Sequence, residues 1–268
     1  MKKFILYSVI FISSIFFAYP FIWMFFATIK PEAELTNIAL IPSHLSLDSY
    51  KIVFSKIPIM RAFLNSLFVS GVVTFSVNVI GAIAGYVLSR MDFKGRKLIL
   101  ALMLFSMMLP FHILLIPLYV FIVKIRLTDT YLALILPGMS SIFAILMYKQ
   151  FFTSIPQSLI DAARIDGCSH LRIIFGILIP ISKPVVITVS IITFMGIWND
   201  VLWPLIVIRE KTLMTMPQMV TLFATGGAAQ SIGPKLAAAF LLALPVIVVY
   251  AFFQKYFISS IAHTGMKE

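Results

Sequence analysis

The side chains best suited to chemistry gather in one stretch, residues 156–170, which reads PQSLIDAARIDGCSH. Asp161 and Asp166 offer carboxylates, and Arg164 offers a guanidinium between them. Such groups form charge-assisted hydrogen bonds with a partner. The stretch carries neither a nucleophile beside a base nor the spacing of metal ligands. It therefore indicates recognition of another protein rather than catalysis.

Motifs for other chemistries are missing from the sequence. It contains no phosphate-binding G-x-x-x-x-G-K-[ST] loop, so we do not expect the chain to hydrolyse ATP by itself. Its four histidines are scattered, without the spacing of metal ligands. Ser140 and Ser141 lie in an apolar segment, but no later apolar segment supplies the histidine base that a serine protease needs. We therefore expect no enzymatic activity and no cofactor or metal bound by this chain.

The composition is that of a membrane protein. Of 268 residues, 61% are hydrophobic and 12% are charged, whereas a soluble domain has about 45–50% apolar and about 25% charged residues. The mean hydropathy is +1.05 and the isoelectric point is about 9.8. The net charge of +11 fits basic loops on the cytoplasmic side of a bilayer. Nucleic acid is not expected as a partner, because no motif interleaves these charges with aromatic residues.

Six segments are long and apolar enough to cross the bilayer as helices, which takes about 20 residues. They cover residues 4–26, 62–88, 98–123, 131–148, 185–206 and 236–256. The loop after the second segment holds four basic residues against one acid, Asp92. This loop is expected to be cytoplasmic. An even number of spans then places both termini and the 150–182 segment on the same side.

The polar stretch at 156–170 predicts two short helices joined by a sharp turn. Pro156 suits the first turn of a helix, and Leu159, Ala162, Ala163 and Asp166 follow at the spacing of one helical face. Gly167 supplies a left-handed residue that ends the first helix, and Ser169 can cap the second. The alternative is a connector lying in the headgroup layer, but an anionic leaflet repels its acids.

The run from Ile155 to Pro184 resembles the EAA signature of permease subunits of binding-protein-dependent ATP-binding cassette (ABC) importers, in its carbohydrate form. Asp161-Ala162-Ala163 stands at the Glu-Ala-Ala and Asp166-Gly167 at the Asp-Gly of that signature. Further matching residues are Phe175, Ile179-Pro180, Trp198-Asn199-Asp200, Leu244-Pro245, Gln254-Lys255-Tyr256-Phe257 and Thr264-Gly265-Met266-Lys267. The order and the loop sizes are most similar to the smaller permease of the maltose-type transporters.

The resemblance implies an all-α, polytopic protein with the type I importer permease fold, forming one permease domain over residues 1–268. It also implies a bacterial or archaeal inner membrane and four kinds of partner: a second permease, two ATPase subunits that use ATP and Mg²⁺, an extracytoplasmic solute-binding protein, and a sugar. The 156–170 stretch becomes a coupling helix between spans four and five. Its ATPase-coupling residues are Asp161, Ala162, Ala163, Arg164, Asp166 and Gly167.

Two further sites follow as expectations. Phe194, Trp198 and Asn199 combine flat rings with a hydrogen-bonding amide and are candidates for the translocation path, whereas Trp203 fits an interfacial anchor better. The glycine-rich loop at Gly226, Gly227, Ala228 and Ala229 is a candidate contact for the binding protein.

The sequence departs from the family pattern at two positions. Asp161 is one methylene shorter than the family's glutamate, and Ser260 stands where a glycine is expected. The rival interpretations are an ATP-independent carrier or channel for small polar solutes and a structural scaffold. The sequence does not identify the sugar.

Overall fold

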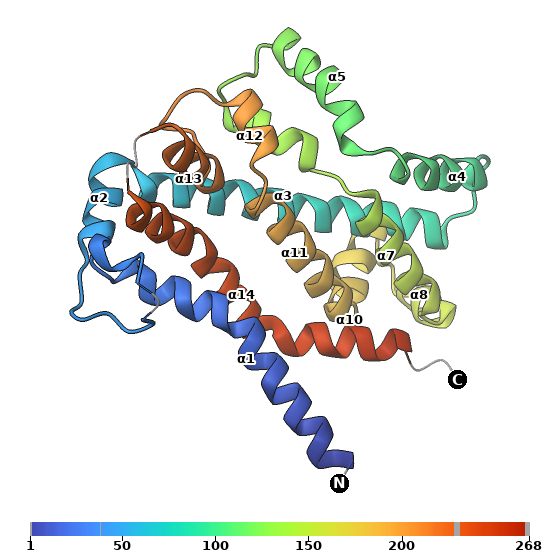
Figure 1. Ribbon diagram of the computed structural model, residues 1–268. Coiled ribbons are helices and arrows are strands. Elements are labelled where there is room, and N and C mark those ends of the chain that lie inside the picture. The colour runs from blue at the N-terminus through green and yellow to red at the C-terminus, as the bar shows by residue number, and fades with distance from the viewer. Residues whose placement is uncertain (1, 38, 228–230, 266–268) are drawn as a thin grey trace. The chain divides into compact units, whose positions relative to one another are not determined.

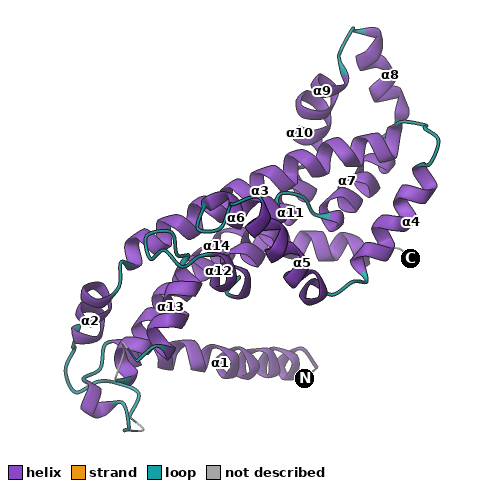
Figure 2. Ribbon diagram, turned by 90° about the horizontal axis from the view of Figure 1, so that it is seen from above, coloured by secondary structure: helices purple, strands orange, loops and turns teal. Residues whose placement is uncertain are grey.

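A computed structural model describes residues 2–37, 39–227 and 231–265, and all the regular structure in these ranges is helical. Figures 1 and 2 show the helices from two directions. Their bounds are α1 (Lys2–Thr28), α2 (Asp48–Lys56), α3 (Ile59–Arg90), α4 (Arg96–Met107), α5 (Phe111–Lys124), α6 (Tyr131–Ile135), α7 (Ile142–Ser154), α8 (Gln157–Ile165), α9 (His170–Ile173), α10 (Ile179–Ile181), α11 (Lys183–Trp198), α12 (Leu202–Val207), α13 (Met216–Thr225) and α14 (Ile232–Gly265). The expectation of an all-helical protein is confirmed.

The chain divides into two compact units. The first combines Met1–Ala62 with Met216–Val249, and the second combines Phe63–Thr215 with Tyr250–Glu268. The single permease domain over residues 1–268 stays a prediction.

Two helices are long and apolar enough to span a membrane by themselves, at Lys3–Thr28 and Ile59–Arg90. Three more candidates are pairs of helices that bend at a break, namely α4 with α5 by 100°, the Tyr131–Gly138 segment with α7 by 43°, and the His170–Ile181 segment with α11 by 87°. The described part of the sixth expected span is a shorter apolar helix at Ile232–Val248. The described residues thus hold two such helices, or up to five spans if each bent pair is one span, and the expected number of six remains a prediction.

Proline explains the sharpest of these breaks. Pro110 precedes α5 with an extended backbone (φ −62°, ψ 135°), and its missing N–H cannot continue the helix from α4. Pro117, by contrast, lies inside α5 without ending it. Inside a membrane, neighbouring helices and local backbone adjustments can satisfy the carbonyls that such residues free.

The second unit is built on the close approach of α3 and α7. A Cβ added at Gly85 would lie 2.6 Å from Cβ of Tyr148, and one at Gly81 would lie 3.0 Å from its ring. Gly81 and Gly85 are four residues apart, so they form a smooth strip on α3 against which the tyrosine packs. The Tyr148 hydroxyl then donates to Oδ1 of Asn78, also on α3, at 2.6 Å.

A second asparagine of α3 makes a similar connection. Asn65 Nδ2 donates to the carbonyls of Thr212 and Met214 at 3.0 and 2.9 Å, and its Oδ1 accepts from Tyr131 at 2.7 Å. Asn65, Ser66 and Ser70 are buried inside this chain. From the sequence alone, polar groups within spans are expected to face a partner subunit or the translocation path, because they are costly against lipid. That expectation is wrong for these three residues, because the chain's own packing already encloses them.

Candidate functional site

Residues 156–170, called the elbow from here on, form two helices with a left-handed turn, as the sequence predicts. Pro156 is extended and precedes α8, and Gly167 has φ +78°. The Gly167 N–H donates to the Arg164 carbonyl at 3.0 Å, and the Cys168 N–H donates to the Ala163 carbonyl at 2.9 Å. This pair of bonds is a Schellman motif, which satisfies carbonyls at the helix end. Ser169 Oγ then accepts from the Arg172 N–H at 3.4 Å and caps α9.

The packing of α8 separates two alanines that the sequence places together. Ile160 and Ala163 are buried inside this chain, whereas Ala162 is exposed. Ala163 is one of the expected ATPase-coupling residues, but its methyl group packs in the chain's own interior, so Ala162 is the alanine that remains available to a partner. The outer side of α8 carries Asp161, Ala162 and Arg164, and it ends in Ile165, whose exposed fraction is 87%.

Arg90, the last residue of α3, holds the start of the elbow. Its Nη1 donates to Oε1 of Gln157 at 2.8 Å, and its Nη2 donates to the carbonyls of Phe152 and Ile155. These two carbonyls lie at the C-terminal end of α7, where the helix leaves acceptors unpaired. Gln157 Nε2 in turn donates to Asp161 Oδ1 at 2.9 Å. One guanidinium thus joins α3, the end of α7 and the first turn of α8.

Tyr86 holds the other side of the elbow. This buried residue lies one helical turn before Arg90, and its hydroxyl is 2.9 Å from Nδ1 of His170, the first residue of α9. The two rings also pack at a centroid distance of 5.7 Å. The last turn of α3 therefore fixes both helices of the elbow. Sequence reasoning missed Tyr86, Arg90 and Gln157, although an arginine at the end of a span beside a basic loop was a usable signal.

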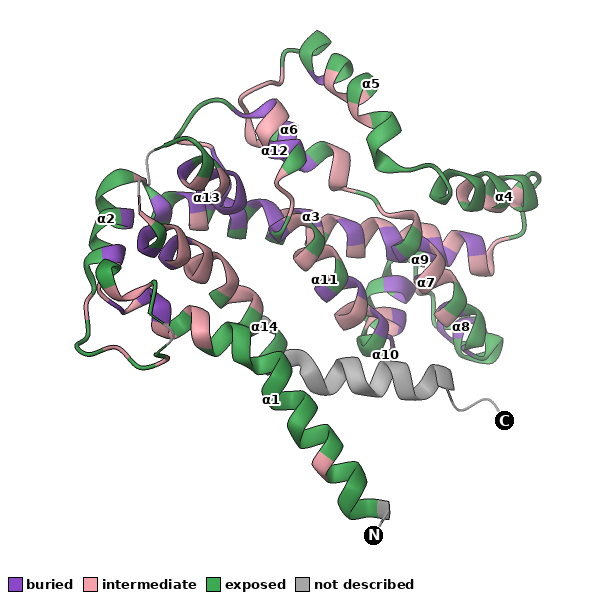
Figure 3. Cartoon of the chain, viewed as in Figure 1, coloured by how far each residue is buried: buried purple, intermediate pink, exposed green. Residues whose placement is uncertain are grey.

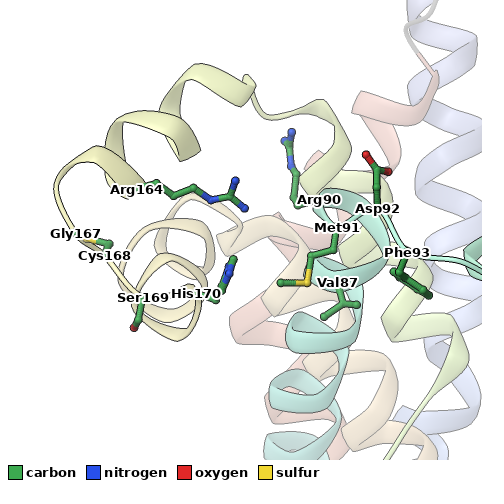
Figure 4. A pocket seen from close by; sticks show the side chains of 10 residues that line it. All are labelled: Val87, Arg90, Met91, Asp92, Phe93, Arg164, Gly167, Cys168, Ser169 and His170. Carbon is green, nitrogen blue, oxygen red and sulfur yellow. The ribbon is translucent and has the colours of Figure 1, made fainter.

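An open cavity of about 950 Å³ lies between the elbow and the end of α3 (Figure 4). Arg164 reaches across the cavity from the elbow side, and Met91 points toward it from α3's end. The lining residues are Val87, Arg90, Met91, Asp92, Phe93, Arg164, Gly167, Cys168, Ser169 and His170. Two guanidinium groups and an imidazole against one carboxylate suit a partner segment that carries hydrogen-bond acceptors or acids.

The residues proposed for the translocation path have different surroundings. Trp198 is fully buried, stacked on Phe194 at 5.7 Å and edge-on to Phe63 at 5.6 Å. Direct contact of its ring with a solute does not fit that burial, so we no longer expect it. Phe194 is half-buried and Asn199 is exposed, with its amide donating to the Met195 carbonyl at 2.9 Å. These two remain predictions for the path.

Trp203 is not an interfacial anchor. Its side chain is buried, and Nε1 donates to the Ala133 carbonyl at 2.8 Å. Asp200 accepts from the Trp203 N–H at 3.3 Å, which helps α12 to begin after the break that follows α11. Trp203 therefore connects α12 to α6, and Asp200 accepts a hydrogen bond from the first turn of α12.

The glycine-rich loop begins as a turn at the end of α13. Gly227 has φ +75°, and a Cβ at Gly226 would lie 2.6 Å from the Leu222 carbonyl oxygen. Ala228 and Ala229 lie outside the described residues. Within the described ranges, no group of three histidine, cysteine, aspartate or glutamate side chains could hold a metal ion.

Comparisons with known proteins identify the family of the chain. The profile of the family described as "Binding-protein-dependent transport system inner membrane component" matches residues 77–263. The chain is 34% identical over 255 residues to the arabinooligosaccharides transport system permease protein AraQ of Halalkalibacterium halodurans, an alignment that covers 93% of this chain and 91% of that protein. It is 29% identical to the trehalose transport system permease protein SugB of Mycobacterium tuberculosis, over 92% of each chain.

A solved structure shares the fold. A chain of the bacterial ABC transporter involved in the import of the acidic polysaccharide alginate superposes with a TM-score of 0.82, at 22% identity, over 96% of each chain. The chain described here therefore belongs to the binding-protein-dependent transport system inner membrane components, and it is a multi-pass permease subunit of an ABC importer rather than an enzyme.

Proposed function

We propose that this chain forms part of the translocation path of an ATP-driven sugar importer. It is the permease subunit of an ABC sugar importer, and relatives that share about a third of its residues are named for arabinooligosaccharides. In this proposal a second permease completes the path, an extracytoplasmic binding protein delivers the sugar, and two cytoplasmic ATPase subunits bind ATP and Mg²⁺. Both termini of the chain lie in the cytoplasm.

The elbow couples the ATPase subunits to the spans. This step is supported by the hydrogen bonds from Arg90 to Gln157, Phe152 and Ile155, called the Arg90 joint. They connect the first turn of α8 to α3 and α7. The other side of α8 exposes Asp161, Arg164 and Ile165 to a partner. An exposed aliphatic side chain flanked by charges is suited to an apolar pocket with a polar rim. When the ATPase displaces α8, α3 moves with it, because the hydrogen bonds of Arg90 connect the two helices directly.

Two further contacts complete the proposal. Asn199 and the accessible part of Phe194 contribute to the path, because sugars present both hydroxyl groups and apolar faces. The loop at Gly226 and Gly227, with Ala228 and Ala229, contacts the docked binding protein. Glycines at such a site allow the two backbones to approach closely.

Crosslinking in the reconstituted assembly tests the elbow. Cys168 is the only cysteine of this chain, so a Cys168→Ser background leaves no competing thiol in the permease itself. Ile165→Cys in this background should crosslink to a cysteine in the ATPase cleft, and the crosslink should abolish sugar-stimulated ATP hydrolysis. Thr153→Cys, an exposed position on α7 before the elbow, is the control and should not crosslink. Sugar uptake without any ATPase subunit would instead favour an ATP-independent carrier.

A further inference from the structure

A second cavity in the same unit is lined mainly by positive charge. It has a volume of about 890 Å³ and lies between the turn after α3, the start of α4 and one residue of α7. Its polar and charged lining consists of Asp92, Lys94, Arg96, Lys97 and Lys149. Four cations therefore face one carboxylate. The elbow cavity shares only Asp92 and Phe93 with it.

The single acid does not balance these cations. Asp92 is fully exposed and pairs with Arg96 at 3.0 Å, which leaves three lysines. Lys149 is the least exposed of the three, since it is half-buried on α7. Like charges held in one cavity repel each other, and a bound anion would offset that repulsion. The start of α4 adds to the positive potential, because Gly95 (φ +92°) begins this helix with no side-chain cap.

The side chains directly beyond the cavity are apolar and exposed. Leu98, Leu102 and Phe105 follow the basic turn at the spacing of one face of α4, with exposed fractions of 63%, 55% and 61%. Figure 3 shows α4 as exposed along most of its length. A cationic cavity at the foot of an apolar helix face matches a molecule with an anionic head and a hydrocarbon tail.

We propose that this cavity, called the basic cavity, binds the phosphate of an anionic phospholipid from the cytoplasmic leaflet. The lysines contact the headgroup, and the acyl chains lie along Leu98, Leu102 and Phe105. The shared ligand chemistry is a phosphate ester, which a free metabolite could also supply. The apolar face of α4 favours the lipid as its source. The proposal rests on the cytoplasmic orientation of the turn after α3, as part of the proposed function.

Lipid binding to the assembled importer tests the proposal. The complex is placed in phosphatidylcholine nanodiscs with increasing phosphatidylglycerol, and the bound phosphatidylglycerol is counted by native mass spectrometry. Lys149→Gln should weaken the tightest phosphatidylglycerol site about fivefold, and the variant with Lys94, Lys97 and Lys149 all changed to Gln roughly 100-fold. Lys149→Gln is measured by itself because it leaves the basic turn at 92–97 unchanged, and that turn carries most of the positive charge that directs insertion.

Equal removal of charge elsewhere is the matched control. Lys56, Lys183 and Lys211 are exposed and do not line the basic cavity. Changing these three to Gln should leave the tightest site intact. An equal loss in this control, or unchanged binding in the cavity variants, would overturn the proposal. Displacement of the lipid by millimolar glycerol 3-phosphate would also overturn it, because the site would then hold free phosphate esters.

A separate measurement keeps this result distinct from the importer function. Sugar-stimulated ATP hydrolysis is measured in the same nanodiscs. If hydrolysis is absent while lipid binding is intact, the proposed importer function fails and the lipid site stands. Protease accessibility of the 92–97 turn in inside-out membrane vesicles, which expose the cytoplasmic side, checks the orientation. A turn cleaved only from the extracytoplasmic side would refute both the orientation and the lipid proposal.

Discussion

Arg90 Nη1 donates to Gln157 Oε1 at 2.8 Å, which connects the last residue of α3 with the first residue of α8 across 67 positions of the chain. Other hydrogens of the same guanidinium cap the end of α7. A planar fork with five N–H donors is needed for this set of bonds, so the joint depends on arginine rather than on positive charge alone.

Replacing Arg90 by lysine should therefore uncouple the importer. A lysine keeps the charge but cannot reach the three acceptors in one geometry. Removal of hydrogen bonds to a charged group costs about 1.5–3 kcal/mol, so we expect sugar-stimulated ATP hydrolysis to fall roughly 10- to 100-fold. Arg96→Lys is the matched control, because its exposed ion pair with Asp92 contributes little. Stimulation by sugar that survives in Arg90→Lys would contradict the role of the joint.

Gly167→Val should be the most damaging single change in the elbow. A β-branched residue is a steric outlier at φ +78°. The strain, about 1–2 kcal/mol, would open the Schellman turn and misdirect α9. Pull-down of the ATPase and sugar-stimulated hydrolysis should both decline.

The comparison variant Gly167→Asn should be much milder, because asparagine tolerates the left-handed region. Apart from the adjacent residues, no heavy atom in the described part of the chain lies within 4 Å of a Cβ at this position, so the difference between the two variants would report backbone conformation and not crowding. Equal behaviour of Val and Asn would show that the left-handed turn has no part in coupling.

Tryptophan substitutions at the two alanines should have different effects. Ala162→Trp adds bulk on the exposed side of α8, so it should block ATPase docking while the permease stays folded. Ala163→Trp adds bulk in a packed interior, where overpacking costs about 1–3 kcal/mol. It should lower the thermal stability of the isolated permease. Thermal unfolding in detergent, measured beside the pull-down, separates these outcomes, and a destabilised Ala162→Trp with normal docking would reverse the assignment.

Asp129 should make the stability of the loop between α5 and α6 depend on pH. Its carboxylate accepts from the N–H groups of Arg209 and Glu210 at 2.5 and 2.9 Å, and these bonds lower its pKa below the usual value. A depressed pKa in the folded state stabilises the protein above the unfolded pKa of about 3.9, and this contribution is lost as the pH falls through the folded value.

Asp129→Asn should remove that dependence. The amide retains one oxygen acceptor without the charge, so we expect a loss of about 1 kcal/mol or less at pH 7 and a difference from the native chain that shrinks as the pH falls below the unfolded pKa of about 3.9. The readout is hydrogen exchange of the Arg209 and Glu210 amides between pH 2 and 7. Equal protection of these amides in both proteins at pH 7 would refute the role of Asp129.

Local chemistry explains what the sequence alone determined. The apolar segments require a bilayer whatever their packing, and prolines end helices because they lack an N–H. Gly167 and Ser169 act on backbone groups within five residues, so the turn and the cap of the elbow could be predicted without any tertiary contact. The family resemblance rested on this stretch together with matching residues further along the chain, such as Trp198-Asn199-Asp200 and Leu244-Pro245.

Tertiary packing decided which side chains remain available to partners. Helical spacing places Ala162 and Ala163 beside each other, but it does not say which of them faces the core, since apolar residues occur on both sides of α8. Trp198 was expected at a path and is enclosed by Phe63 and Phe194. Arg90 reaches Gln157 only because the close approach of α3 and α7 at Gly81 and Gly85 brings the two ends together. Contacts between residues so far apart in the chain depend on that packing, which periodicity and local propensity do not encode.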